Sequence, residues 1–582
     1  MTNLIKQAKQ QITAALKNAA ERANAEGKLV SSELGAFTVE ITSDASHGDF
    51  AANAAMVSAK NMRTSPRNIA EALLSALDLS ETMFERCEVA GPGFLNFFLS
   101  EGYAADVVSA VLNEGENYGR TDFGKNEKVM VEFVSANPTG PMHIGNARGG
   151  ALGDCLAAVL DWSGHDVTRE FYINDAGNQI DKFALSLDVR YMQHYLGEDA
   201  VELPEDAYHG ADIKDRAVEF AKEYGDKFVK AEESERRRAL VEFALPKNIA
   251  ALKSDLEKYR IFYDVWFHES ELHKSGLVKE VIGILTEKGL TYEKEGALWY
   301  KNAEFMAEKY RAQGKSEKEI EKLELKDEVL VRANGNPTYF AADIAYHYNK
   351  FAQRGFNRVI NVWGADHHGH VARLCGAMDA VGLDGDKLDI VLMQLVKLMR
   401  DGEVVRVSKR TGKSITLSDL LNEVDVDAAR LFFNLREPAS HLDFDLDLAV
   451  SQNSQNPVYY VQYAHARICS ILKSLEADGI KLREASREEL CLLNSEEEKE
   501  LISHVAKLPE EIVIAAKAYD PARITRYVID LATKFHKFYN ANRVKLPENE
   551  PLMQARIALC LSVKTVIKNV LTMFGISVPE SM

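Results

Sequence analysis

One polar stretch, His143-Ile144-Gly145-Asn146, has the residue types of a phosphate-binding site. It follows an apolar run at 129–134 that indicates a buried parallel strand, and the chain between the two is broken by Pro138, Gly140 and Pro141. A helix that begins beyond the carboxyl end of such a strand offers N–H groups and a positive dipole end to phosphate. Gly145 leaves room for a flat base or sugar, and His143 can donate to a phosphate oxygen. A lone histidine near a strand end is more often structural, so this stretch alone leaves both interpretations open.

A second candidate is the cationic loop at 408–413, which contains Lys409, Arg410 and Lys413. It follows an expected strand at 388–400 and a turn at 401–403, and a helix is expected to begin near Ser418. Mobile lysines suit a reaction in which charge builds on a transferring phosphorus atom, because they can close on the transition state more tightly than on bound ATP. Taken alone, a basic surface turn explains the loop equally well.

Tyr339 and Asp343 are a candidate pair for binding a cation. They lie four residues apart in a helical pattern and therefore share one helix face. An aromatic ring beside a carboxylate suits a guanidinium group, which stacks on the ring and forms a bidentate salt bridge. Packing of a first helical turn in the core is the alternative. The run at 364–370 holds Asp366 and three histidines, but ligand contacts at a strand end fit it better than a metal site.

The elements that must position these residues indicate a multidomain α/β protein. Residues 119–450 are expected to form a Rossmann-like domain with a parallel sheet, because strand, helix and strand patterns alternate from 129 onwards. A highly charged helical insertion is expected at about 181–290. Its Glu and Arg run is best explained as a solvated helix face.

The two flanking segments differ in character. Residues 1–118 indicate a small α+β module that ends in a strand at 87–99, interrupted by Gly91-Pro92-Gly93. Residues 451–582 carry apolar positions at helical spacing and predict an all-α bundle. Aromatic and basic side chains mix in this bundle, as expected where unpaired bases stack and phosphates are gripped, although core packing could explain many of the aromatics. The candidate RNA contacts are Tyr459, Tyr463, Arg467, Phe538, Tyr539 and Asn540.

Composition narrows the class of protein. The 582 residues are 46% hydrophobic and 27% charged, which is ordinary for a soluble globular protein. The net charge of -18 argues against a protein that coats nucleic acid indiscriminately, but not against a specific RNA partner. The six cysteines include no C-x-x-C pair, so neither a zinc site nor a disulfide framework is expected. The N-terminus is not a secretory signal and no apolar run is long enough for a membrane span, which predicts a cytoplasmic protein with no membrane partner.

Taken together, 143–146 and 406–410 resemble the two ATP-binding motifs of class I aminoacyl-tRNA synthetases, known as HIGH and KMSKS. The order and the long separation of the motifs fit. Asn146 and Arg406 depart from the family pattern, so His143, Gly145, Ser408 and Lys409 are the firmer correspondences and the contact made by Asn146 stays open. Flanking stretches narrow the resemblance to the arginyl-tRNA synthetase family over essentially the whole chain, among them 132–146, 170–180, 339–347, 362–370, 426–433 and 575–582.

The resemblance implies the site residues. Those expected to act in catalysis are His143, Gly145, Asn146, Ser408 and Lys409, and ATP binding adds Pro138, Gly140 and Val407. Those expected to bind arginine are Glu132, Ser135, Asn137, Tyr339, Asp343 and Asp366. A site of carboxylates suits the guanidinium group of arginine, which is always charged and has five N–H donors. The ammonium group of lysine could not make the same set of hydrogen bonds.

The resemblance also implies the reaction. Arginine attacks the α-phosphorus of ATP, which enters with Mg²⁺, and the 2′-hydroxyl of the terminal adenosine of tRNA(Arg) then takes the arginyl group. The resemblance further implies that tRNA binds before activation, that residues 1–118 contact the outer corner of tRNA, that 451–582 are a DALR anticodon-binding domain, and that the protein is a monomer. Two alternatives remain, a different class I synthetase such as the cysteinyl or glutaminyl enzyme, and a catalytically silent RNA-binding paralogue.

Overall fold

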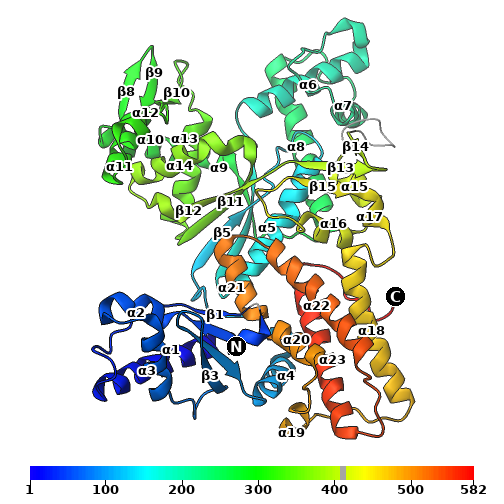
Figure 1. Cartoon of the computed structure of the whole chain (residues 1–582). Coiled ribbons are helices and arrows are strands. Elements are labelled where there is room, and N and C mark those ends of the chain that lie inside the picture. Colours follow the sequence, from blue (N-terminus) through cyan, green and yellow to red (C-terminus); the bar gives the residue numbers. More distant parts are fainter. Residues whose placement is uncertain (43, 407–414) are drawn as a thin grey trace.

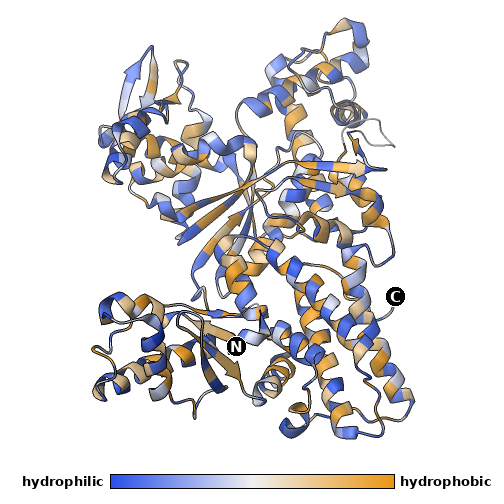
Figure 2. Cartoon of the chain, viewed as in Figure 1, coloured by the Kyte–Doolittle hydropathy of each residue, from blue (hydrophilic) through white to orange (hydrophobic). Residues whose placement is uncertain are grey.

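A computed structural model describes residues 1–42, 44–406 and 415–582 (Figure 1). Figure 2 shows apolar residues gathered on the central strands and on the inward faces of the helices, with hydrophilic residues turned outward. No helix in the described part of the chain combines the length and the apolarity needed to cross a bilayer. The multidomain α/β architecture predicted from the sequence is confirmed.

The N-terminal unit is an antiparallel sheet of order β1-β2-β4-β3 packed against helices. The expected single strand at 87–99 is instead a hairpin, in which Cys87 pairs with Phe97. Gly91 and Gly93 both have positive φ (53° and 135°), so they turn the chain back where a straight strand was expected. The elements are α1 (Leu4–Ala25), β1 (Val39–Ile41), β2 (Phe50–Ala52), α2 (Ala54–Met62), α3 (Pro66–Ala76), β3 (Phe84–Ala90) and β4 (Phe94–Leu99).

The central sheet is parallel throughout and has the order β12-β11-β5-β6-β7. Its middle strand, β5, leads into helix α5, and β6 completes the predicted β-α-β unit. Parallel strands buried under helices are apolar along their length, as the run at 129–131 is. The elements are β5 (Lys128–Glu132), α5 (Ile144–Trp162), β6 (Asp166–Ile173), β7 (Val265–His268), α13 (Tyr339–Tyr348), β11 (Arg358–Gly364), α14 (His368–Val381) and β12 (Leu388–Met393).

The expected insertion at 181–290 is mostly helical, but it also contains a strand. Helices α6 (Asn178–Leu196), α7 (Ala211–Tyr224) and α8 (Glu233–Lys258) share a core of their own around Phe183, Tyr191 and Phe220. Strand β7 then pairs with β6 and forms an edge of the central sheet, so the end of the range belongs to the parallel-sheet domain. Helices α9 (Glu269–Lys274) and α10 (Leu277–Glu287) follow it.

Two small sheets flank the central one. The first has the order β10-β9-β8 and lies on the far side of α13 and α14. The second has the order β14-β13-β15, so the expected strand at 388–400 divides between two sheets. The elements are β8 (Thr291–Lys294), β9 (Ala297–Tyr300), α11 (Asn302–Ala312), α12 (Glu317–Glu321), β10 (Glu328–Val331), β13 (Val396–Arg400), β14 (Glu403–Val405), α15 (Leu417–Leu421), α16 (Val426–Phe433), β15 (Leu442–Asp445) and α17 (Leu446–Val450).

The C-terminal segment is the predicted helical bundle. Helix α4 (Gly102–Glu114) also packs on this bundle, because Tyr103, Val107 and Val111 share its core and not that of the N-terminal sheet. The other helices are α18 (Pro457–Ala477), α19 (Arg487–Leu490), α20 (Glu496–Ala506), α21 (Leu508–Ala518), α22 (Ala522–Ala541) and α23 (Glu550–Met573).

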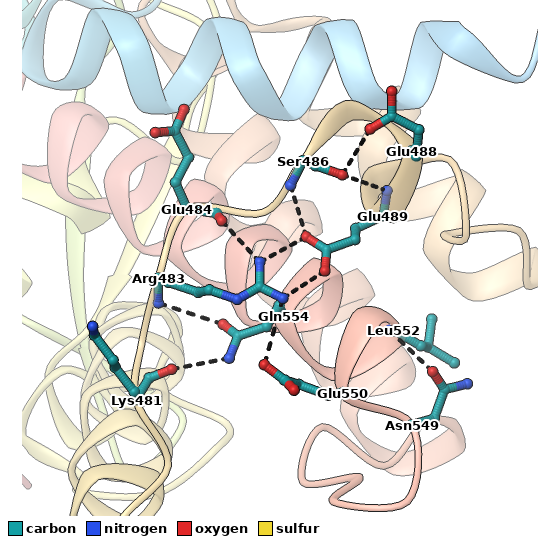
Figure 3. A network of polar contacts seen from close by, with 10 residues as sticks. All are labelled: Lys481, Arg483, Glu484, Ser486, Glu488, Glu489, Asn549, Glu550, Leu552 and Gln554. Carbon is teal, nitrogen blue, oxygen red and sulfur yellow. Dashed lines mark hydrogen bonds and ion pairs between the residues drawn. The ribbon is translucent and has the colours of Figure 1, made fainter.

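A polar network holds the link between α18 and α19 against α23 (Figure 3). The Arg483 guanidinium donates to both carboxylate oxygens of Glu489, at 2.8 and 2.6 Å. Gln554 of α23 donates to the backbone oxygen of Lys481 at 2.9 Å. The hydrogen bonds from Arg483 lower the pKa of Glu489 to about 2, so the pair stays ionised in any physiological buffer.

Candidate active site

The polar stretch at 143–146 forms the N-terminus of helix α5, as predicted. His143 is the N-cap residue, and its backbone N–H donates to Oδ1 of Asn146 at 3.0 Å. The Asn146 side chain therefore caps the helix. A Cβ atom at Gly145 would meet nothing within 4 Å, so the space over this backbone is open to a ligand.

A cavity of about 930 Å³ opens at this helix end, and we call it the α5 cavity. Thr416 and His143, which both line this cavity, form an isolated antiparallel β-bridge. The backbone N–H of Leu417 donates to the backbone oxygen of Met142 at 2.9 Å. The chain that follows the cationic loop is thus fixed to the α5 N-terminus. The candidates Val407, Ser408 and Lys409 lie outside the described residues. The lining residues include Ser135, Asn137, Gly140, His143, Asn146, Gln179, Tyr208 and Asp419.

The helical insertion supplies the opposite wall of the α5 cavity. Tyr208 and Gln179 are hydrogen-bonded to each other there, and Asn248 of α8 donates to the backbone oxygen of Pro138 at 2.9 Å. Pro138 is buried and Asn137 is exposed. The insertion therefore holds the loop that precedes the α5 N-terminus.

The chain turns sharply after strand β5. Val134 and Ser135 both have positive φ (68° and 42°), which is rare for residues other than glycine and costs free energy. This backbone brings the Ser135 hydroxyl to Glu132, to which it donates at 2.9 Å, while it accepts from the backbone N–H of Tyr172 at 3.2 Å. Ser135 thus connects the α5 cavity to a second pocket on the other side of the loop.

The carboxylate of Glu132 is already matched by a cation. Lys350, fully buried, forms an ion pair with it and donates to Oδ1 of Asn361 at 3.3 Å. A buried carboxylate paired in this way has little negative charge left for a ligand. The expected contribution of Glu132 is therefore to fix Ser135 and the end of β5, and less to neutralise a guanidinium.

The second pocket, which we call the acidic pocket, has a volume of about 440 Å³. Asp343 lies on its wall, and Nε2 of His370 is 3.0 Å from Oδ2 of this carboxylate. Tyr339, at the first turn of α13, is 40% exposed, and its hydroxyl is near Gly177 at the edge of the α5 cavity. The side chain of Asp366 is 81% exposed at the pocket rim. The lining residues are Glu132, Tyr172, Asp343, Tyr346, His347, Trp363, Asp366, His367, Gly369, His370 and Arg373.

A carboxylate that sequence reasoning missed, Glu269, lies beside this pocket. It is 3% exposed and follows directly after β7, and Tyr172 donates a hydrogen bond to it. Burial raises the pKa of Glu269 to about 7; the hydrogen bond from Tyr172 opposes the shift, and the charges of Asp343 and Asp175 add to it. Neither Glu269 nor Asp343 forms an ion pair with a lysine or arginine of the described chain. The two carboxylates with Tyr172 beside them suit a guanidinium group, whereas Tyr339 does not line this pocket.

His367 and His370, which follow β11, line the acidic pocket. Among the described residues, no group of three or more His, Cys, Asp or Glu side chains is arranged to hold a metal ion. His367 lies 3.6 Å from Asp366, and His370 hydrogen-bonds to Asp343. Both contacts belong to the wall of the acidic pocket.

A fully buried guanidinium, that of Arg148, lies in the second turn of α5. Arg148 donates to the backbone oxygens of Gln394 at 2.7 Å and Glu437 at 3.1 Å, and no described residue accepts a hydrogen bond from its Nε. Burial lowers the pKa of Arg148 to about 10. Because Gln394 joins β12 to β13, Arg148 fixes the start of the segment that leads to the cationic loop.

Five of the candidate RNA contacts are exposed or half-buried, and the sixth, Phe538, is buried. The rings of Tyr459 and Tyr463 stack with centroids 6.3 Å apart, and the Arg467 guanidinium lies 5.2 Å from the centre of Tyr463 and 5.0 Å from that of Tyr539. Arg467, Tyr463 and Tyr539 line a cavity of about 660 Å³. Asn540 is exposed on the same helix as Tyr539, but Phe538 is fully buried in the bundle core and is not available to a nucleic acid.

Comparisons with known proteins match every part of the chain. Residues 6–99 match the family model described as arginyl tRNA synthetase N terminal domain, 107–451 that of the class I (R) tRNA synthetase catalytic domain, and 461–582 that of the DALR anticodon binding domain. The arginine–tRNA ligases of Acetivibrio thermocellus and Caldanaerobacter subterraneus subsp. tengcongensis are 53% and 55% identical over 582 residues, with 100% of each chain covered. The solved arginyl-tRNA synthetase of Thermus thermophilus shares the fold, with a TM-score of 0.70 at 22% identity over 98% of this chain and 100% of that one.

Proposed function

The chain belongs to the arginyl-tRNA synthetase family and is a class I arginine–tRNA ligase, and from this premise we propose how its residues divide the work. The enzyme activates L-arginine with ATP to arginyl-adenylate and pyrophosphate. It then transfers arginine to the 2′-hydroxyl of the terminal adenosine of tRNA(Arg) and releases AMP. The proposals below concern the residues that carry these two steps.

The acidic pocket binds the guanidinium group of arginine. Asp343 and Glu269 supply the negative charge, and Tyr172 supplies a ring and a hydroxyl group, while Tyr339 stands on the side toward Gly177. The observation that carries this assignment is that two carboxylates without a lysine or arginine partner flank one pocket next to the α5 N-terminus. A bound guanidinium offsets the free-energy cost of keeping the buried Glu269 carboxylate ionised. The ion pair that neutralises Glu269 is therefore also the contact that recognises arginine.

The other end of arginine reaches toward the α5 cavity. Ser135 and Asn137 lie on that side of the acidic pocket, and Glu132 holds Ser135 in place. These residues therefore orient the amino and carboxylate groups toward the α-phosphorus of ATP. Asp366 stands at the rim, where its exposed carboxylate adds long-range attraction for a cationic substrate.

The α5 cavity binds ATP. The N-terminus of α5 and His143 hold phosphate oxygens, the open backbone at Gly145 receives the adenosine, and Asn146 keeps the helix end formed. Pro138 and Gly140 shape the loop before it. The carboxylate of arginine attacks the α-phosphorus in line with no covalent enzyme intermediate, so catalysis consists of positioning and charge stabilisation.

Val407, Ser408 and Lys409 act on the phosphates of ATP, as the family resemblance implies. Lys409, with Arg406 or Lys413, neutralises the leaving pyrophosphate. Mg²⁺ bound to the ATP phosphates would supply positive charge there, held by phosphate oxygens and one or two carboxylates. Asp419, on the cavity wall, is a carboxylate that could face such an ion.

The RNA-facing surface extends beyond the catalytic domain. We propose that Tyr459, Tyr463, Arg467, Tyr539 and Asn540 contact the anticodon region, since exposed aromatic rings and a guanidinium suit unpaired bases. Phe538 is left out of this surface because it is buried.

The domains are proposed as 1–118, 119–450 and 451–582, with α4 as an arm of the first that packs on the third. Residues 1–118 contact the outer corner of tRNA, and tRNA binds before activation. The enzyme works as a monomer in the cytoplasm, where its substrates are.

The test is exchange of radiolabelled pyrophosphate into ATP. Exchange is expected with arginine and tRNA(Arg) together, and not with lysine in place of arginine or without tRNA. Exchange without tRNA would contradict the proposed order of binding. Binding of tRNA with no exchange under any condition would favour the silent RNA-binding paralogue.

A further inference from the structure

A cavity of about 550 Å³ lies between the N-terminal sheet and the helical bundle, and we call it the interdomain pocket. Its residues contribute to neither the α5 cavity nor the acidic pocket. Helix α20 lies next to the N-terminal unit at this place (Figure 1). The lining residues are Ile5, Ile41, Thr42, Gly48, Asp49, Phe50, Leu99 and Tyr103 on one side, and Glu496, Lys499, Glu500, Ser503, His504, Lys507, Lys534 and Lys537 on the other.

The lysines of the bundle side fall into a paired and an unpaired set. Lys534 and Lys537 bind the two carboxylate oxygens of Glu500, the latter at 2.8 Å, and these hydrogen bonds lower the pKa of Glu500 to about 2. Lys499 and Lys507, by contrast, form no ion pair or side-chain hydrogen bond with any described residue. Glu500 is therefore fully engaged, and no carboxylate of the described residues lies within ion-pair distance of the other two ammonium groups.

The other charged groups act on these lysines from beyond ion-pair distance: Asp49 acts on Lys499, which is exposed, and Glu500 and Glu511 act on Lys507, which is half-buried. Asp49 accepts from the backbone N–H of Leu99 at 2.8 Å, and burial raises its pKa. Glu496 is exposed at the start of α20. Burial lowers the pKa of His504 to about 4, so this side chain is neutral. Lys507 is partly buried and has Lys534 near it, and both effects lower its pKa.

An uncompensated ammonium group beside a partly apolar wall is costly unless an anion joins it. Ile5, Phe50 and Leu99 form such a wall, which limits screening by water and strengthens any ionic contact made there. We propose that the interdomain pocket binds a phosphate group, with Lys507 and Lys499 as its ligands. The group comes either from a free phosphorylated molecule or from the backbone of bound tRNA. This site is additional to the aminoacylation reaction.

The test is competitive acylation of lysines in the full-length protein, with the modification at each lysine measured by mass spectrometry. Inorganic phosphate is the probe, and chloride at matched ionic strength is the control. We expect phosphate to protect Lys507 and Lys499 saturably, while Lys17, exposed on α1, stays equally reactive. Because this readout needs no catalysis, it stays informative if pyrophosphate exchange fails.

Two variants test the assignment of the ligands. Lys507→Gln should raise the phosphate concentration that half-protects Lys499 by about tenfold, the usual effect of losing one charge-assisted contact. The matched variant Lys17→Gln should leave it unchanged. Equal protection by chloride, no protection of Lys507 by phosphate, or an unchanged midpoint in Lys507→Gln would each overturn the proposal.

A further arm identifies the source of the phosphate group. If tRNA protects Lys507 and Lys499 in the absence of phosphate, the site receives the RNA backbone. If phosphate protects these lysines and tRNA does not, the site serves a free phosphorylated molecule. Both results support a phosphate site.

Discussion

The two ring nitrogens of His370 contact different partners, Nε2 lying 3.0 Å from Oδ2 of Asp343 and Nδ1 lying 3.3 Å from Nη2 of Arg373. Because a guanidinium can only donate, Nδ1 accepts and Nε2 carries the proton that it donates to Asp343. One oxygen of Asp343 is therefore held by the protein. No described residue donates a hydrogen bond to the other oxygen, which we propose to contact arginine.

Replacing Asp343 with Asn should remove half of the charge that faces the guanidinium. The expected result is a rise of about 100-fold in KM for arginine, because a charge-assisted bond becomes neutral in a partly buried pocket, with KM for ATP little changed. Steady-state pyrophosphate exchange measures both constants. Asp366→Asn at the exposed rim is the matched control and should change KM for arginine less than about threefold. Equal effects of the two substitutions would remove Asp343 from the guanidinium site.

Arginine binding should depend on pH through Glu269. Its carboxyl group has a pKa of about 7 in the empty pocket, so it is protonated at lower pH and must ionise to pair with a guanidinium. The dissociation constant for arginine should therefore rise by up to about tenfold per unit as the pH falls below 7. Calorimetric titration of arginine from about pH 8 to pH 5.5 checks this, and Glu269→Gln should bind weakly with a flat profile.

The same group gives a stability effect of opposite sign in the empty protein. The pKa of Glu269 in the folded protein is raised above the ordinary value of 4.5. The stabilisation that comes from keeping its carboxyl group neutral is therefore fully present below pH 4.5 and is lost as the pH rises through about 7. Between pH 5 and pH 8, the free energy of unfolding of Glu269→Gln should therefore fall less than that of the parent protein, and thermal denaturation measures both. A parallel pH dependence of the two proteins would show that Glu269 titrates normally.

Arg148→Met should destabilise the catalytic domain. The substitution leaves the oxygens of Gln394 and Glu437 without their donors, which costs about 3 kcal/mol, and it loosens the segment that leads to the cationic loop. Thermal denaturation with and without ATP measures the loss, and KM for ATP should rise. Arg67→Met, on the exposed face of α3, is the control and should change stability by less than about 0.5 kcal/mol.

Lys409→Ala should lower the rate of arginine activation by about 100-fold or more, because it removes charge stabilisation that is strongest in the transition state. Affinity for arginine, measured by calorimetry, should change little. Lys397→Ala, on the exposed side of β13, serves as the control. An unchanged activation rate in Lys409→Ala would remove the proposed role in pyrophosphate release.

Two substitutions distinguish side chains of the bundle that bind RNA from those that pack in its core. Tyr463→Ala should weaken tRNA binding by about tenfold through loss of a stacking ring, with exchange kinetics for ATP and arginine at saturating tRNA unchanged. Phe538→Ala should instead lower stability by about 3–5 kcal/mol, because it leaves a cavity in the core. Filter binding of tRNA and thermal denaturation distinguish the two outcomes. Weaker tRNA binding by a stably folded Phe538→Ala would return that ring to the RNA surface.

The sequence by itself determined the features that depend on neighbours along the chain. The turn of Pro138, Gly140 and Pro141 and the helix that begins after His143 are local, because prolines, glycines and caps act within a few residues. The shared face of Tyr339 and Asp343 follows from helical spacing, and the helices of 451–582 follow from apolar periodicity. The family resemblance supplied the reaction, which no spacing could.

Tertiary structure alone decided which distant residues complete the site. Strand β7 has only four residues and lies between helices, so its pattern does not stand out from a helical range. The sequence pattern therefore does not predict that Glu269, which follows this strand, belongs to the site. The pairing of Glu132 with Lys350 joins positions 218 residues apart. The burial of Phe538 depends on which face of α22 meets the rest of the bundle. These features depend on long-range packing and on the desolvation of charge, and neither is encoded in the spacing of residues along the chain.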